Sequence, residues 1–193
     1  MFVVFDGLDA SGKSTQGLIF YNRLTACGKT VLLRIHPSED NFFGRKARKF
    51  LLSHGINAHF SSAIFYMFDV IHSVLLYSWR RYDFIIFVRY LMGTAYLPYP
   101  LDKILYHFFA STVPTSDYMF FLDLPPEEAN RRIRENRSSH AVEMFENLEN
   151  LRRIRTKALS LLSTDKWNVI NGNRTVGQVE KDIAEKLDLH YTR

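Results

Sequence analysis

Residues Gly7–Thr15, with the sequence GLDASGKST, constrain the fold of this chain more than any other segment. They match the phosphate-binding loop pattern G-x-x-x-x-G-K-[ST], in which glycines let backbone N–H groups turn toward a phosphate. The loop follows the apolar run Phe2–Phe5 and leads into Lys13–Ala26, which is compatible with a helix. The N-terminus of a helix adds about half a positive charge to such a site. The pattern predicts a strand, a loop and a helix that together bind a nucleoside triphosphate.

The residue types of the loop assign expected roles within that site. In loops of this kind the lysine reaches the β- and γ-phosphates and the hydroxyl that follows holds Mg²⁺. We therefore expect Lys13 to contact the phosphates of ATP and Ser14 to be the metal ligand. The other expected donor-site residues are Gly7, Leu8, Asp9, Ala10, Ser11, Gly12 and Thr15. The alternative is an ordinary glycine turn between a strand and a helix.

Composition and charge exclude several classes of protein. An apolar content of 47% in 193 residues indicates a folded chain with a sizeable core, and we expect one domain over residues 1–193. A net charge of +5 suits anionic ligands but is too small to indicate nucleic-acid binding. The single cysteine, Cys27, excludes an internal disulfide. The sequence shows no basic leader and no uncharged stretch apolar enough to span a membrane, so we expect a cytoplasmic protein that does not bind membranes.

Apolar runs and helical patterns alternate along the chain. Short apolar runs predict strands at 2–5, 30–35, 84–88, 118–124 and 167–171. Helical spacing and end signals predict helices at 13–26, 44–53, 57–79, 101–111, 126–137, 143–163 and 175–187. Strands separated by helices favour an α/β fold with a five-stranded parallel sheet and helices on both faces.

In a sheet of this kind, ligands bind beyond the carboxyl ends of the strands. Charged residues follow several of the predicted strands. They are Asp6 and Asp9 after the first, Arg34 after the second, Arg89 after the third and Asp123 at the end of the fourth. Such residues can simply mark strand ends at the surface. Arg89 directly follows five apolar residues, which favours a functional role for it.

Several segments resemble the thymidylate kinase family in order and spacing. The opening Phe5–Gln16 carries an aspartate inside the phosphate-binding loop and the trailing Ser-Thr-Gln. Arg34, Pro37, Gly44 and Arg48 resemble the phosphate-acceptor segment of that family. Arg89-Tyr90 followed by Thr94-Ala95-Tyr96, and then Phe121–Ala129, resemble its later strand and helix segments. The resemblance covers almost the whole chain and implies a P-loop NTPase fold with a small lid at about 131–143.

The resemblance also implies an activity, the transfer of the γ-phosphoryl group of ATP to a nucleoside monophosphate, with dTMP giving dTDP as the main expectation. It implies that Asp9 contacts the acceptor sugar and orients Arg89, that Arg89 bridges the two sets of phosphates, and that Phe65 stacks on the acceptor base. The expected catalytic residues are Lys13, Arg89, Asp9 and a lid arginine, Arg137. The expected acceptor-binding residues are Asp9, Arg34, Arg48, Phe65, Asp69, Arg89 and Tyr96.

The lid assignment depends on how the arginines of 131–137 are paired. The loop positions Ala10 and Ser11 carry no arginine, which in this family implies that the lid supplies the cation. Glu127 and Glu128 precede Arg131 and Arg132 by four residues, a spacing that also suits surface ion pairs on a helix. Arg137 lacks such a partner in the sequence and is therefore the candidate.

Three departures from the family pattern leave the acceptor open. Val88 stands where the family has a metal-associated aspartate, so that Asp6 or Asp123 would substitute or metal binding would be weaker. Asp69 stands where the family has an arginine that donates to the thymine carbonyl, and Leu97 replaces a glutamine. A carboxylate at 69 would favour a base with hydrogen-bond donors. The alternatives are therefore a kinase for another monophosphate and a nucleotide-binding protein with weak transferase activity.

The resemblance further suggests a homodimer, for which the aromatic helix 57–79 could supply the buried face.

Overall fold

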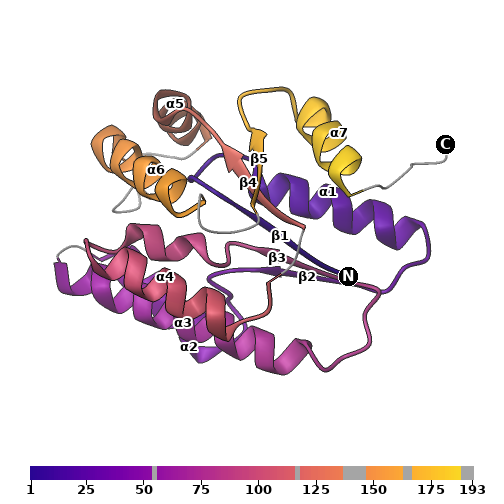
Figure 1. Ribbon diagram of the computed structural model, residues 1–193, viewed down its shortest axis with the longest axis horizontal. Helices are drawn as coiled ribbons and strands as arrows, with labels where there is room; N and C mark the ends of the chain where they lie inside the picture. Colours follow the sequence, from indigo (N-terminus) through magenta and orange to yellow (C-terminus); the bar gives the residue numbers. More distant parts are fainter. Residues whose placement is uncertain (54–55, 116–117, 137–146, 163–166, 188–193) are drawn as a thin grey trace.

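A five-stranded parallel sheet in the order β2-β3-β1-β4-β5 forms the centre of the fold (Figure 1). The computed structural model describes residues 1–53, 56–115, 118–136, 147–162 and 167–187. The strands are β1 (Phe2–Gly7), β2 (Val31–Ile35), β3 (Phe84–Val88), β4 (Met119–Asp123) and β5 (Trp167–Asn171). The central strand is almost continuously apolar and buried, as expected for a parallel sheet that is covered on both faces. The predicted α/β fold is confirmed.

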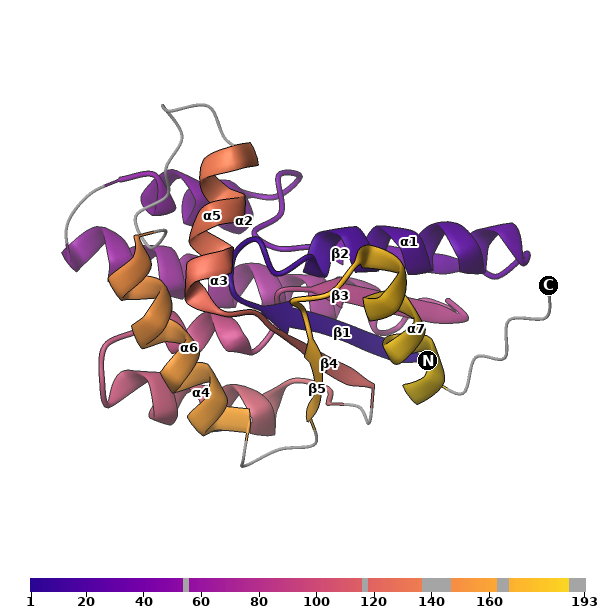
Figure 2. The same ribbon diagram turned by 90° about the horizontal axis from the view of Figure 1, so that it is seen from above.

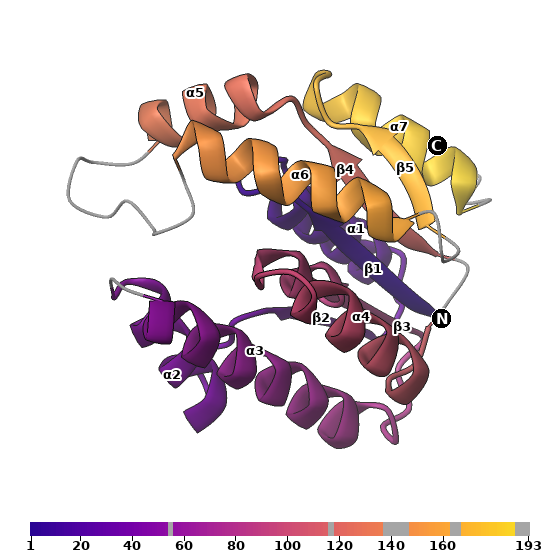
Figure 3. The same cartoon turned by 60° about the vertical axis from the view of Figure 1, so that its left-hand side comes forward.

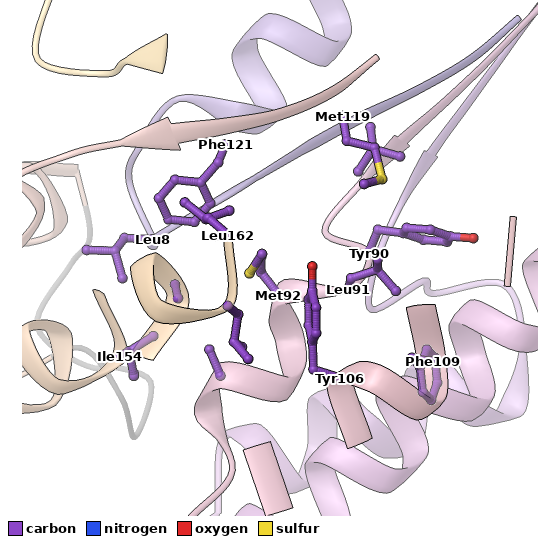
Figure 4. Close-up of a cluster of buried hydrophobic side chains, with 14 of the residues drawn as sticks. Leu8, Tyr90, Leu91, Met92, Tyr106, Phe109, Met119, Phe121, Ile154 and Leu162 are labelled. Carbon is purple, nitrogen blue, oxygen red and sulfur yellow. The ribbon is translucent and has the colours of Figure 1, made fainter. Parts of the chain in front are cut away.

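Alternate residues of each strand point to opposite faces and produce two apolar clusters. Val3 and Phe5 of β1 pack under α1 (Lys13–Ala26) and α7 (Val176–Lys186). Val4 points the other way and joins the larger cluster, in which side chains from β4, a 3₁₀ turn, α4 and α6 converge (Figure 4). The elements over this second face are α3 (Ile56–Tyr77), η1 (Met92–Tyr96), α4 (Leu101–Thr112), α5 (Pro126–Asn136) and α6 (Leu148–Leu162). Figure 3 shows α4 and α6 in front of β1 and α1 behind it.

One further helix, α2 (Phe42–Leu51), packs along α3. Its N-cap is Asn41, whose side-chain oxygen accepts a hydrogen bond from the Gly44 amide at 2.9 Å. A Cβ at Gly44 would lie 2.0 Å from the Ser38 carbonyl oxygen, so the chain can turn tightly here only with glycine. The loop after β2 is therefore held firmly against the first turn of α2.

The observed helices and strands follow the predicted ones within a few residues, with two exceptions. Helix α6 begins at Leu148, whereas the sequence predicts a start at 143, and residues 143–146 lie outside the described part of the chain. The 3₁₀ turn η1 was not predicted. Of the expected lid at 131–143, residues 131–136 belong to α5 and the remainder lies outside the described residues.

The carboxyl end of β1 lies between the ends of β3 and β4, its two neighbours in the sheet. At that end the chain leaves the sheet through residues 8–12 and enters α1, and Figure 2 shows α5 close to the same end. This is the crevice in which open α/β sheets bind their ligands.

Candidate active site

The loop between β1 and α1 has the backbone of an anion site. Gly7 and Gly12 have positive φ values of 145° and 92°, and a Cβ at Gly7 would lie 2.6 Å from the Leu122 carbonyl oxygen. Gly12 is the N-cap of α1 and offers no side chain to cap the helix. The first amide groups of α1 are therefore left for a ligand, and the helix dipole favours a negatively charged one.

A hollow of about 620 Å³ opens over this loop. Its lining combines the loop with three arginines from separate parts of the chain: Arg89 after β3, Arg132 on α5 and Arg174 before α7. The other lining residues are Ala10, Ser11, Gly12, Lys13, Ser14, Thr15, Gln16, Gly172, Val176 and Val179. The concentration of positive charge around bare amide groups suits a polyphosphate.

Ala10 adopts the left-handed backbone conformation, with φ 59°, inside this loop. For a residue with a Cβ that conformation costs about 1–2 kcal/mol, whereas glycine adopts it freely. Allowing for the greater freedom of glycine in the unfolded chain, Ala10→Gly is expected to raise the free energy of unfolding by about 0.5–1 kcal/mol. Urea unfolding measures this. Ala26→Gly, at the exposed end of α1, should give no gain, and a loss of stability in Ala10→Gly would contradict the expectation.

Asp9 is the electrostatic centre of the site. Its carboxylate accepts a short hydrogen bond from Arg89 and one of 3.0 Å from the Tyr96 hydroxyl, and it lies 3.6 Å from Lys13 Nζ. Burial alone would raise the pKa of Asp9, but the Arg89 and Lys13 cations outweigh it and hold that pKa well below its ordinary value. Burial also raises the pKa of Tyr96, which keeps its proton for Asp9.

Lys13 is buried in the first turn of α1, where its Nζ donates to the Leu8 carbonyl at 2.6 Å. Burial lowers the pKa of its ammonium to about 8, with Arg89 acting in the same direction and Asp9 opposing both. The ammonium is thus folded back onto its own loop, beside the hollow that it lines. It needs only a side-chain movement to reach a phosphate there.

Arg89 lines two hollows at once. The second one lies on the other side of Arg89, between the end of β1, α2, α3 and η1, and its lining is mostly apolar. Its lining residues are Asp6, Gly7, Asp9, Pro37, Ala47, Leu51, Ser62, Ala63, Tyr66, Arg89, Gly93 and Tyr96. The backbone of Arg89 is left-handed, with φ 62°. Strain of this kind in a non-glycine residue is typical of functional sites.

Asp6 and Asp123, the two candidates for the missing metal-associated acid, are both engaged elsewhere. Asp6 accepts from the amides of Gly7, Tyr90 and Met92 at 3.2, 2.9 and 3.1 Å. Both Asp123 oxygens accept from Arg155, each at 2.7 Å. Asp6 thus contacts the first residue of the phosphate-binding loop, whereas both oxygens of Asp123 are bonded to Arg155; the substitution of either for the missing aspartate stays a prediction.

Val88 itself is a core residue. It is fully buried, and a Cβ at Gly17 of α1 would lie 2.7 Å from its Cγ2. An aspartate could not be accommodated there without an unpaired buried charge. Within the described ranges no group of three His, Cys, Asp or Glu side chains could hold a metal ion. The Ser14 hydroxyl fits Mg²⁺ only as a single ligand, in a coordination shell completed by phosphate oxygens and water.

Two predicted acceptor residues on α3 do not reach the second hollow. Phe65 stacks on Phe50 with ring centroids 5.6 Å apart, and Tyr66 lines the hollow instead. Asp69 is fully buried and accepts from the Ser38 amide, the Ser38 hydroxyl and the Asn41 amide group, at 2.6, 2.5 and 2.7 Å. Neither predicted residue lines the second hollow in this conformation, because α3 turns these side chains toward α2 and the loop before it.

The two basic residues predicted for acceptor phosphate binding are also engaged elsewhere. Arg34 donates to both Asp40 oxygens and to Ser73 Oγ, and it lies over the Tyr77 ring at 5.3 Å. Arg48, exposed on α2, forms an ion pair with Glu39. Neither lines the hollows that contain Arg89. The predictions for Arg34 and Arg48 are not met in this conformation.

The lid candidate Arg137 lies outside the described residues. Arg131 forms surface ion pairs with Glu128 and Glu135, as its spacing predicts. Arg132 also pairs with Glu128, but in addition its guanidinium lies 3.4 Å from the carbonyl oxygens of Ala10 and Gly172. Sequence reasoning missed Arg174 and Tyr66, and it considered Arg132 but preferred Arg137 because of the expected ion pair with Glu128. The only signal for Arg132 was its place among the arginines before the lid.

Comparison with known proteins agrees with this geometry. The family model for thymidylate kinase matches residues 5–183. A thymidylate kinase of Thermosipho melanesiensis is 28% identical, covering 97% of this chain and 98% of its own. A probable thymidylate kinase of Pyrobaculum calidifontis is 30% identical, covering 97% and 96%.

The fold comparison points the same way. The solved thymidylate kinase of Candida albicans superimposes with a TM-score of 0.75 at 19% identity and covers 97% of this chain and 90% of its own. The chain has a phosphate-binding loop and an arginine that lines two hollows, and the family model matches nearly its whole sequence. The chain therefore belongs to the thymidylate kinase family.

Proposed function

We propose that this chain, acting as one kinase domain, transfers the γ-phosphoryl group of ATP to dTMP and releases dTDP and ADP. Membership of the thymidylate kinase family supports the reaction, ATP-dependent phosphorylation of dTMP to dTDP. The observation that carries the assignment to particular residues is that Arg89 lines both hollows. A guanidinium in that position can contact the donor phosphates on one side and the acceptor phosphate on the other.

The proposed donor site is the hollow over the phosphate-binding loop. The amides of residues 10–15 surround the β- and γ-phosphates, and Lys13 leaves the Leu8 carbonyl to contact them. Arg132 and Arg174 add positive charge from the opposite wall. Phosphoryl transfer requires little beyond two aligned substrates and stabilisation of the charge on the transferring group. Mg²⁺, held by Ser14 and the phosphate oxygens, would supply further charge neutralisation there.

The proposed acceptor site is the hollow bounded by α2, α3 and η1. Asp9 and Tyr96 lie at its inner end, where they face the sugar of the acceptor. Pro37, Ala47 and Leu51 offer apolar contacts for a base, and Tyr66 offers an aromatic ring. The alternative acceptor, a base rich in hydrogen-bond donors, depended on Asp69. Because both oxygens of Asp69 are bonded to Ser38 or Asn41, that alternative loses its support.

The experiment is ADP release with Mg-ATP across a panel of nucleoside monophosphates. We expect kcat/KM for dTMP to exceed that for monophosphates of cytosine, guanine and adenine by about tenfold or more. Asp69→Asn should leave this preference unchanged. A shift of preference in Asp69→Asn would restore the alternative acceptor. No turnover on any monophosphate would favour a nucleotide-binding protein with weak transferase activity.

We also propose a homodimer formed through α3. Phe60, Phe68 and Leu75 are exposed on one face of this helix, and Asp69, the one Asp, Glu, Lys or Arg among its described side chains, is buried. Phe60–Tyr77 is long and apolar enough to cross a membrane by length and composition alone. A face without charge suits a second copy of the same face, and sedimentation in solution tests for the dimer.

We further propose that the protein is cytoplasmic and binds neither membranes nor nucleic acid. Arg137 is proposed as the lid residue that supplies a cation to the phosphates.

A further inference from the structure

His36 lies directly after β2, is fully buried, and contacts Arg89 through its ring and its backbone. Its Nδ1 is 3.0 Å from the Arg89 carbonyl oxygen, and its own carbonyl oxygen is 3.5 Å from the Arg89 guanidinium. Its amide donates to the Val88 carbonyl at 3.0 Å. His36 therefore holds both the main chain and the side chain of the residue between the two hollows.

The contact with Arg89 fixes the place of one hydrogen on the His36 ring. The Arg89 carbonyl can only accept, so Nδ1 carries a hydrogen. Nε2 is 3.0 Å from Ser73 Oγ, and Ser73 Oγ is 3.0 Å from Arg34 Nε, which can only donate. In the neutral ring Nε2 accepts from the Ser73 hydroxyl, which accepts in turn from Arg34. Every member of the chain Arg34, Ser73, His36 and Arg89 then has a partner.

The surroundings of the ring favour its neutral form. The pKa of His36 is lowered to about 4, chiefly by burial and also by the Arg34 cation, with Asp69 acting in the opposite direction. The groups that face the ring are Asp69 on α3, Arg34 on β2, Arg89 after β3 and the Tyr66 ring, 6.4 Å from it between centroids. The geometry requires the N–H on Nδ1, and burial favours the neutral ring, in which Nε2 accepts from Ser73.

Arg89 needs such support because its backbone is strained. A left-handed φ of 62° persists in a non-glycine residue only where surrounding contacts fix it. The Arg89 amide donates to the Phe5 carbonyl at 2.9 Å, and the His36 ring holds the carbonyl on the other side of the same residue. Without the ring contact, the peptide after Arg89 would be held only by its N–H, which the Tyr90 amide donates to Asp6, and the position of Arg89 would be less tightly fixed.

We propose that His36 is a positioning residue for phosphoryl transfer: its Nδ1–H fixes the Arg89 carbonyl, and Ser73 and Arg34 fix the tautomer that provides this N–H. The inference rests on the proposed function of Arg89 as the group that contacts both sets of phosphates. Arg34, predicted as an acceptor ligand, is thereby assigned to the support of Arg89 instead.

Two substitutions at position 36 separate positioning from packing. An asparagine amide can reach the place of Nδ1, whereas the longer glutamine places its amide near that of Nε2. We expect His36→Asn to keep kcat within about fivefold of the wild type and His36→Gln to lose roughly 10²-fold in kcat, since small displacements of a positioned group cost rate. KM for ATP should change little in either variant. If packing volume alone matters, the order reverses, because glutamine is closer in size to histidine, and that order would overturn the proposal.

Nitrogen NMR of the imidazole gives a readout that does not require activity. We expect the Nδ1–H tautomer in the wild type, unchanged between about pH 5.5 and 8. Ser73→Ala should perturb that tautomer, and Ser78→Ala, an exposed serine near the end of the same helix, should not. An Nε2–H tautomer or a charged ring in the wild type would overturn the proposal even if the position-36 variants fail to fold. If the wild type fails to phosphorylate dTMP, the proposed function falls while the NMR result still decides the state of His36.

Discussion

Replacing Lys13 with alanine is expected to lower kcat for phosphoryl transfer by about 10³-fold or more, which corresponds to about 4 kcal/mol of transition-state stabilisation. The reason is that Lys13 is buried beside the hollow over the phosphate-binding loop, where a movement of its side chain away from the Leu8 carbonyl brings Nζ to the phosphates. A cation held against the transferring group stabilises the charge that develops on it in the transition state. Steady-state and single-turnover kinetics with Mg-ATP and dTMP measure the effect.

The stability of Lys13→Ala distinguishes a catalytic loss from a folding defect. Burial of the Lys13 ammonium is costly, as its lowered pKa indicates, and Asp9 keeps Arg89 and Tyr96 as partners when the lysine is removed. We therefore expect the free energy of unfolding to change by only about 1 kcal/mol. Lys29→Ala, at an exposed position, is the matched control and should keep full activity. Near-normal turnover in Lys13→Ala would contradict the role assigned to this residue.

The fold was predictable because its strands are short apolar runs and its helices begin and end at recognisable signals. The capping box of α7 is an example, in which Thr175 and Gln178 bond to each other's backbone. The phosphate-binding loop was predictable for a related reason, since its glycines are required by local backbone geometry. The 3₁₀ turn η1 was not, because its conformation depends on packing against α4 and α6 rather than on local sequence.

The acceptor site was harder to predict because it depends on which way one helix is turned. Consecutive side chains on a helix point about 100° apart, so the rotation of α3 about its axis decides whether Phe65 or Tyr66 faces the hollow. That rotation is set by the extensive packing of α3 on α2, which brings Phe65 onto Phe50. The sequence pattern alone, apolar on several faces of α3, does not specify it.

Charged residues were mispredicted where their partners come from distant segments. Asp69 bonds to Ser38, 31 residues earlier, and Arg34 bonds to Ser73, 39 residues later. Spacing rules for ion pairs cover only residues within a helix turn or two, which is why the pairing of Arg131 was predictable. Arg132 follows the same rule in its pair with Glu128, but its contact with the phosphate-binding loop joins distant segments and could not be predicted from spacing.

Arg89 carries the second large effect. Arg89→Ala is expected to lower kcat/KM by about 10³-fold, because the guanidinium is the described cation that lines both hollows. Arg89→Lys should recover only part of this, since an ammonium cannot offer two groups of N–H donors in a fixed plane to two phosphates at once. Kinetics with saturating ATP and varied dTMP measure both variants. Equal activity of Arg89→Lys and the wild type would show that only the charge matters there.

Arg89→Gly tests whether the strain at this position serves the site. Alanine keeps the cost of a left-handed backbone, whereas glycine removes it, so Arg89→Gly should be more stable to urea than Arg89→Ala by about 0.5–1 kcal/mol. Both variants lack the guanidinium and should be equally inactive. The two variants would then differ in the free energy of unfolding but not in activity. This is expected where the fold maintains a strained backbone that positions a functional side chain. If the glycine variant were no more stable than the alanine variant, the left-handed φ of Arg89 would carry no energetic cost, and the His36 ring would have nothing to restrain.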